Sequence, residues 1–167
     1  MAKIYNENNT ELKQNSARIP EYVWQTSQYL DKMASSDQMY FDIRELGPGK
    51  YSFPYHYHRG AEEMMVILQG GCTMRTPEGF SKVQQGDIVF FEKGETGAHQ
   101  FYNHTDEVCR YLDIRIKVDI DVCDYPDSGK VNILPYFNIY DAAQTLDYFE
   151  GEEGPSAHWA SFFESKE

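Results

Sequence analysis

The sequence feature that most constrains the fold is a His-x-His pair inside a β-rich segment. His56 and His58 are two residues apart, and side chains with that spacing leave the same face of a β-strand. Gly60 permits a tight turn, and Glu63 then opens an apolar run that is typical of a returning strand. Two imidazoles and one carboxylate would therefore converge, as in a metal site that lacks one ligand.

A further ligand is expected from residues 86–103, where a β-rich run and a Gly-punctuated loop lead to His99. Three imidazoles and one carboxylate suit a divalent transition metal (Mn, Fe, Co, Ni, Cu or Zn) and leave room for water or substrate. We therefore predict that His56, His58, Glu63 and His99 are the metal ligands. The alternative is a hydrogen-bonded polar cluster that holds no metal.

These segments resemble the two motifs of the cupin superfamily. The first motif is Gly, five residues, His-x-His, three or four residues, Glu, six residues and Gly; it is matched by Gly49, His56, His58, Glu63 and Gly70. The interval to Gly70 selects Glu63 over Glu62. One extra residue precedes His56.

The second motif is Gly, five residues, Pro-x-Gly, two residues, His, three residues and Asn; it is matched by Gly86, Gly94, His99 and Asn103. Glu92 stands where the family has Pro, and two extra residues precede His99. The resemblance covers residues 37–118 and implies the fold and the ligand set, but no particular reaction. Residues 125–131 are also similar to a segment of bacterial cupins, some of which are described by analogy as sugar-phosphate-isomerase-like.

The pattern of short strands predicts an all-β fold. From residue 38 to residue 118, β-rich runs are punctuated by Gly or Pro, and no helical crossover fits between them. We predict an antiparallel double-stranded β-helix, the jelly-roll barrel of cupins, with its metal inside the mouth. Residues 1–37 are predicted to form an N-terminal arm, 38–134 the barrel, and 135–167 an extension that packs on the barrel or on a partner subunit.

Two helices are expected outside the barrel. The apolar positions of residues 18–33 loosely fit a helix, with Ser27 as a candidate cap, and residues 141–149 fit a second short helix.

Composition and charge indicate which cellular compartment and which partners to expect. The net charge of −12 opposes binding to nucleic acid or to an anionic membrane. Three cysteines without a Cys-x-x-Cys pair indicate a reducing cytoplasm, and the polar first twenty residues lack the apolar core of a signal peptide. We expect a homodimer, because such barrels expose sheet edges and the terminal arms carry apolar side chains that need cover.

Several other residues are functional candidates. The arginines that could bind an anionic substrate are Arg44, Arg75, Arg110 and Arg115. The tyrosines that share the face opposite the histidine pair, for which packing is expected, are Tyr51, Tyr55 and Tyr57. We expect His104 and His158 to be surface or packing residues, and Asn103 to be a turn residue.

Two classes of function are compatible with these features. The first is a metal-dependent enzyme, isomerase-like or dioxygenase-like, that acts on a small polar or anionic metabolite. The second is a binding or sensing protein that holds a small molecule without converting it. The sequence identifies no catalytic residue beyond the predicted ligands. An inward-facing acid or base in addition to those ligands would favour the enzyme.

Overall fold

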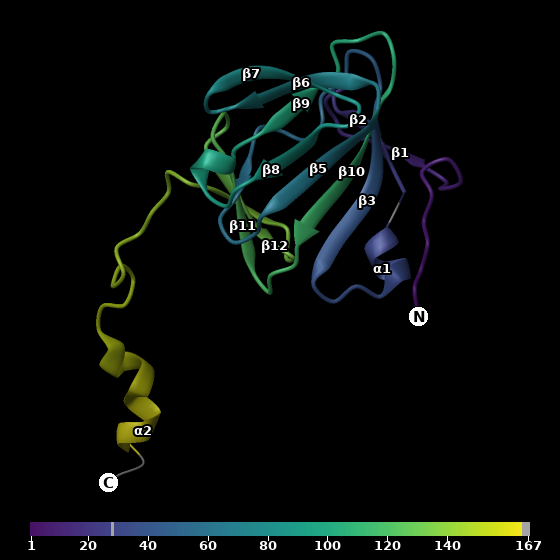
Figure 1. Cartoon of the computed structure of the whole chain (residues 1–167). Coiled ribbons are helices and arrows are strands. Elements are labelled where there is room, and N and C mark those ends of the chain that lie inside the picture. Colours follow the sequence, from purple (N-terminus) through teal and green to yellow (C-terminus); the bar gives the residue numbers. More distant parts are fainter. Residues whose placement is uncertain (28, 165–167) are drawn as a thin grey trace.

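The computed structural model describes residues 1–27 and 29–164, and antiparallel strands make up most of it (Figure 1). In chain order the strands are β1 (Lys13–Ser16), β2 (Val23–Thr26), β3 (Met39–Leu46), β4 (Tyr57–His58), β5 (Glu63–Gln69), β6 (Gly71–Thr76), β7 (Gly79–Gln84), β8 (Ile88–Phe91), β9 (Gln100–Tyr102), β10 (Cys109–Ile116), β11 (Asp121–Tyr125), β12 (Lys130–Leu134) and β13 (Asn138–Asp141). The helices are α1 (Leu30–Ala34) and α2 (Ala160–Glu164), with 3-10 turns η1 (Glu95–Gly97) and η2 (Pro155–Trp159).

The strands form two facing layers. One layer is a six-stranded sheet in the order β1-β2-β3-β10-β5-β8. The other combines the sheets β7-β6-β9 and β13-β12-β11-β4, which are joined by bridges from Tyr51 to Tyr102 and from His56 to His99. Strand pairing is antiparallel throughout the named sheets. The predicted double-stranded β-helix is therefore confirmed.

The alternation of residues in the central strands decides which side chains face the barrel interior. In β5, Glu63, Met65 and Ile67 are buried while the residues between them are only half-buried. Strand β10 pairs with β5 so that Arg115 lies opposite Glu63 and Asp113 lies opposite Met65. Because directly opposed residues share a face, these side chains enter the same interior.

An apolar core fills one part of that interior. Its members are Leu46, Met65, Ile67, Cys72, Val83, Phe91, Phe101, Cys109 and Tyr111. Each is at most 7% exposed, and burying an apolar side chain of this size contributes about 1.5–3 kcal/mol. Cys72 and Cys109 are thus small core residues. This core supports the strands that carry the charged residues.

Gly70 turns β5 into β6 and has to be glycine. Its φ of +69° lies in the left-handed region, and a Cβ there would approach the carbonyl oxygen of Val108 to 2.4 Å. The sequence motif places a glycine after an interval of six residues from Glu63, and the close approach to Val108 explains why this position requires glycine.

The first helix prediction was right only in part, and the second was wrong. Residues 23–26 form β2, which pairs with β3, and the helix is confined to α1. The Ser27 hydroxyl donates to Asp42 Oδ1 at 3.0 Å and accepts the N–H of Ile43, so it holds this segment to β3 instead of capping a helix. Asp141 ends β13, and turns follow it up to η2.

The C-terminal segment leaves the barrel after β13. Its described side chains from position 142 to position 162 are all exposed, and Figure 1 shows the chain running away from the strands to α2. The predicted extension therefore contacts the barrel at its start, where β13 pairs with β12, whereas the described residues 142–162 are exposed, and packing on a partner subunit stays a prediction. Among the described residues, no helix combines the length and the apolar character needed to cross a membrane.

Candidate metal centre

The four predicted ligands come from three neighbouring parts of the barrel wall. His56 and His99 exchange backbone hydrogen bonds, with N–H to O distances of 3.2 and 2.9 Å. His58 lies in β4, opposite Cys123 of β11. Glu63 begins β5. All four are buried, with exposed fractions of 9% or less.

Their functional atoms lie close together. Glu63 Oε2 is 3.3 Å from His99 Nε2 and 3.6 Å from His58 Nε2. Ligand atoms of His56, His58 and Glu63 all lie within 4.8 Å of one another, and the ring centroids of His56 and His99 are 4.8 Å apart. The structure therefore brings all four predicted residues into one cluster, which His99 joins through its contact with Glu63.

Backbone carbonyls orient two of the three rings. Nδ1 of His56 donates to Pro54 O, and Nδ1 of His99 donates to Gly97 O, each at 2.9 Å. With the proton on Nδ1, the lone pair of each ring is on Nε2. Gly97 has to lack a side chain, because a Cβ would lie 1.7 Å from the carbonyl oxygen of Glu92. The loop before β9 can thus close tightly and present His99.

A carboxylate orients the third ring. His58 Nδ1 lies 2.5 Å from Asp121 Oδ2, and the N–H of Gly60 donates to Asp121 Oδ1 at 3.0 Å. Burial raises the pKa of Asp121, but His58, the N–H of Gly60 and Arg115 together outweigh burial, and the pKa is lowered overall. A carboxylate behind a ligating histidine fixes the ring and makes its other nitrogen a better donor.

Two buried atoms of the four predicted ligands lack a hydrogen-bond partner. Among the described residues, neither Glu63 Oε2 nor His99 Nε2 makes a hydrogen bond, although the two atoms are 3.3 Å apart. A buried polar atom without a partner costs about 1–3 kcal/mol. A divalent cation would satisfy both atoms, and nitrogen with carboxylate donors suits borderline transition metals. The residues present therefore fit the predicted metal.

Electrostatics in the cluster favour the metal-binding protonation state at His56 and Glu63, but not at His99. Burial, followed by the charge of His99, lowers the pKa of His56 to about 3. Burial raises the pKa of Glu63, but the nearby histidines outweigh it and hold that pKa well below its usual range. Burial lowers the pKa of His99, but Glu63, the Gly97 carbonyl and Asp113 together outweigh burial, and the pKa is raised overall. At neutral pH His56 is a neutral imidazole and Glu63 is a carboxylate.

Charged residues beyond the four ligands also face the interior. Arg44 Nη1 lies 2.6 Å from Asp113 Oδ2, and Asp113 is only 4% exposed. Burial raises the pKa of Asp113 to about 7; Arg44 opposes this shift and Glu63 adds to it. Arg115 Nη1 donates to His58 Nε2 at 3.2 Å. The interior thus holds one acid and two guanidinium groups beside the cluster.

The remaining sequence candidates lie elsewhere. Arg75 forms a two-pronged ion pair with Asp127, and Arg110 pairs with Glu45. The exposed His104 contacts Thr73, and His158 lies exposed in η2. The Asn103 side chain donates to the carbonyls of Leu46 and Glu107, each at 2.7 Å, so it organises the turn after β9.

Asp113 of β10 and the interior residues of β11 were not identified from the sequence. Asp121, Cys123 and Tyr125 alternate in β11, Cys123 Sγ lies 3.2 Å from His58 Nδ1, and the Tyr125 ring stacks on His56 at 5.8 Å. Their spacing of two is the same signal that identified the His-x-His pair. A strand pairing between β4 and β11 was needed to use it.

Comparison with known proteins agrees with this geometry. A model of the cupin domain matches residues 43–115, which include all four predicted ligands. No curated protein matches the sequence.

Three solved structures illustrate the likeness. A proposed sugar phosphate isomerase from Acidithiobacillus ferrooxidans is 25% identical over 84% of this chain and 90% of that chain, with a TM-score of 0.75. A sugar phosphate isomerase of the cupin superfamily from Silicibacter pomeroyi is 18% identical over 87% and 98%, with a TM-score of 0.73. A predicted oxalate decarboxylase from Thermotoga maritima is 18% identical over 70% and 100%, with a TM-score of 0.57. The chain is a cupin-domain protein, with the domain at residues 43–115.

Proposed function

We propose that the protein is a metal-dependent enzyme of the isomerase type, acting on a small anionic or polyhydroxylated metabolite. His56, His58, Glu63 and His99 hold one divalent ion. The observation that supports an enzyme over a binding protein is Asp113, a buried acid beside the ligand cluster whose pKa is about 7. The name of the neighbour from A. ferrooxidans favours isomerisation over dioxygenation.

When bound by His56, His58, Glu63 and His99, a divalent ion would supply a Lewis acid to polarise a carbonyl or hydroxyl of the substrate. Asp113 then has the pKa that proton transfer at neutral pH requires, since both of its forms are populated there. As a carboxylate it takes the proton from the hydroxyl-bearing carbon beside the carbonyl, and as an acid it returns that proton to the former carbonyl carbon, while the proton of that hydroxyl passes to the former carbonyl oxygen. Its ion pair with Arg44 fixes the orientation of the carboxyl group.

Arg115 supplies the second recognition element. None of the ion pairs among the described residues includes Arg115, and its guanidinium points at His58 in the ligand cluster. A guanidinium binds phosphate or carboxylate through two parallel hydrogen bonds. Arg115 therefore binds the anionic end of the metabolite while the reacting carbons lie near Asp113.

The test is turnover of aldose and ketose phosphates by metal-loaded protein, followed by NMR. Asp113→Asn should lower turnover by about 100-fold or more, as expected for loss of an acid–base group, and should keep its metal. Asp119→Asn, at an exposed position outside the cluster, is the matched control. Saturable binding without turnover would favour the sensing function, and full turnover in metal-free protein would contradict the proposal.

We also propose that the protein works as a homodimer. Large apolar side chains are exposed on β7 and β8, namely Phe80 at 76%, Ile88 at 68% and Phe90 at 56%. The C-terminal segment adds exposed Tyr148, Phe149 and Trp159. Such surfaces favour association with a second copy. Light scattering at micromolar concentration should give twice the 19.4 kDa of one chain; the mass of a single chain would contradict the dimer.

We also propose that the protein is cytoplasmic. Cys72, Cys109 and Cys123 are all free and buried in the structure, which suits a reducing compartment. The net charge of −12 supports a small-molecule partner over nucleic acid or an anionic membrane.

A further inference from the structure

The strand that carries the histidine pair has a second face. Tyr55 and Tyr57 alternate with His56 and His58, so their side chains lie on the opposite side of the barrel wall. On that side is a cavity of about 430 Å³, and none of the four predicted metal ligands lines it. Its volume is within the range of small-molecule sites, roughly 300–1,000 Å³. It is therefore large enough to hold a ligand of its own.

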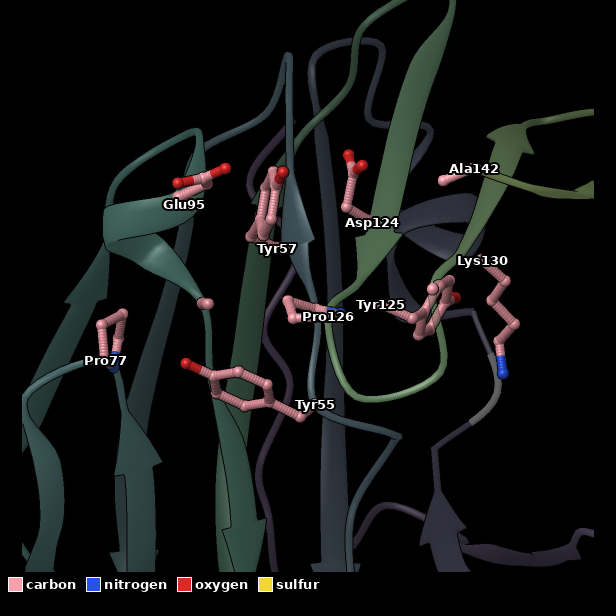
Figure 2. Close-up of a pocket in the computed structure, with 11 residues that line it drawn as sticks. Tyr55, Tyr57, Pro77, Glu95, Asp124, Tyr125, Pro126, Lys130 and Ala142 are labelled. Carbon is pink, nitrogen blue, oxygen red and sulfur yellow. The ribbon is translucent and has the colours of Figure 1, made fainter. Parts of the chain in front are cut away.

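The cavity has two chemically different ends (Figure 2). Toward one end, the Tyr57 hydroxyl lies between the carboxylates of Glu95 and Asp124. Toward the other end lie the Tyr55 ring and two prolines, Pro77 and Pro126.

The two carboxylates differ in how far they are neutralised. Asp124 receives two hydrogen bonds from Arg59, at 2.7 and 2.8 Å. Glu95 is exposed, and no ion pair among the described residues includes it. Lys130 also lines the cavity, but its ammonium lies 4.7 Å from the centroid of the Tyr125 ring, on the side away from Glu95 (Figure 2). The carboxylate end therefore keeps an uncompensated negative charge.

The Tyr55 ring is held in place by its surroundings. Tyr55 is only 7% exposed, and the guanidinium carbon of Arg75 lies 4.0 Å from the ring centroid. Arg75 is itself fixed by its two hydrogen bonds to Asp127. A ring fixed in this way is a preformed apolar surface, and preformed surfaces bind with a smaller loss of entropy.

We propose that this cavity binds a small organic cation, namely a protonated primary amine with an aromatic or apolar body. The ammonium group lies at the Glu95 and Tyr57 end, and the body packs on Tyr55, Pro77 and Pro126. An anion would meet two carboxylates, and a neutral ligand would leave Glu95 without a counter-charge. The net charge of −12 favours the approach of a cation.

The site is separate from the metal centre, although Tyr125 belongs to both. Tyr125 lines the cavity and its ring stacks on His56. Amine binding needs neither metal nor turnover, so it is tested independently of the enzyme proposal.

The experiment compares three probes of one shape by calorimetry and by ¹H–¹⁵N NMR on the full chain: phenethylamine, 2-phenylethanol and phenylacetate. Phenethylamine should bind, with shift changes at residues 55–57, 95 and 124–126. 2-Phenylethanol should bind at least about fivefold more weakly, equivalent to about 1 kcal/mol, and phenylacetate more weakly still.

Glu95→Gln should weaken phenethylamine binding by about fivefold and bring it close to that of the alcohol. Glu21→Gln, which removes one exposed carboxylate elsewhere, is the matched control and should leave binding unchanged. The proposal is overturned if phenethylamine shows no saturable binding at millimolar concentration, if the alcohol binds equally well, or if the two variants behave alike.

Discussion

The two ends of the barrel interior are built on the same strands and differ in chemistry. Along β5 the inward residues pass from Ile67 and Met65 to Glu63, and along β10 they pass from Tyr111 to Asp113. One end is packed with apolar side chains, and the other holds buried ionisable groups whose polar atoms are not all satisfied. The difference indicates that stability and chemistry are assigned to separate ends, so that mutations should affect one without the other.

The apolar end should show the largest effect on stability. Phe101 is fully buried among the core residues, so Phe101→Ala should lower the free energy of unfolding by about 3–5 kcal/mol through lost burial and a cavity. Phe80→Ala, at a side chain 76% exposed, should change it by less than about 0.5 kcal/mol. Denaturant unfolding measures both. A loss below about 1 kcal/mol for Phe101→Ala would remove the distinction between the ends.

The polar end should control metal affinity. Glu63→Gln removes one ligand charge with little change in volume, and affinity should fall by about 100-fold or more, beyond the ~10–100-fold typical of outer partners. The neighbouring Glu62 is half-buried on the other face of the strand, so Glu62→Gln is the matched control. Calorimetric metal titration measures the metal affinity of both variants. Equal losses in the two variants would mean that the sequence interval to Gly70 selected the wrong carboxylate.

A smaller effect is expected behind the ligands. Asp121 fixes the His58 ring through Nδ1, so Asp121→Asn should weaken metal binding by about tenfold while leaving stoichiometry intact. Asp119→Asn provides a comparison at an exposed position. If metal affinity in Asp121→Asn matched the wild type, the carboxylate would have no orienting role.

The smallest effect concerns pH in the metal-free protein. Burial lowers the pKa of His56 to about 3, so below pH 6.5 the unfolded chain binds a proton there that the folded chain does not. This residue therefore makes stability fall as pH falls, by about 1 kcal/mol between pH 6 and pH 5. His56→Gln should remove that part of the pH dependence. Unchanged dependence in the variant would show that His56 is not held neutral.

The fold and the four clustered residues were predictable because their signals are local. Alternation placed His56 and His58 on one face, and the Gly-punctuated turns gave the strands between which Glu63 and His99 meet. The β2 strand was not predictable, since its pairing with β3 depends on residues about twenty positions away. The roles of Asp113 and Asp121 were not predictable either, because their partners are also distant in the sequence.

Sequence patterns describe the electrostatics of the cluster least well. Burial raises the pKa of Asp113, Arg44 opposes this shift and Glu63 adds to it, and these two residues are 69 and 50 positions away in the sequence. The tyrosines opposite the histidines were expected only to pack. The cavity beside them is formed together with η1 and the β11–β12 turn, which come later in the sequence.

The central claim is that the polar end of the barrel holds one divalent metal ion. Its most direct test is the metal content of the purified protein by mass spectrometry, with His58→Ala compared to His104→Ala, which removes an exposed histidine outside the cluster. The account predicts about one equivalent of a divalent transition metal in the wild type and in His104→Ala, and loss of most of it in His58→Ala. Full stoichiometry in His58→Ala would contradict the assignment.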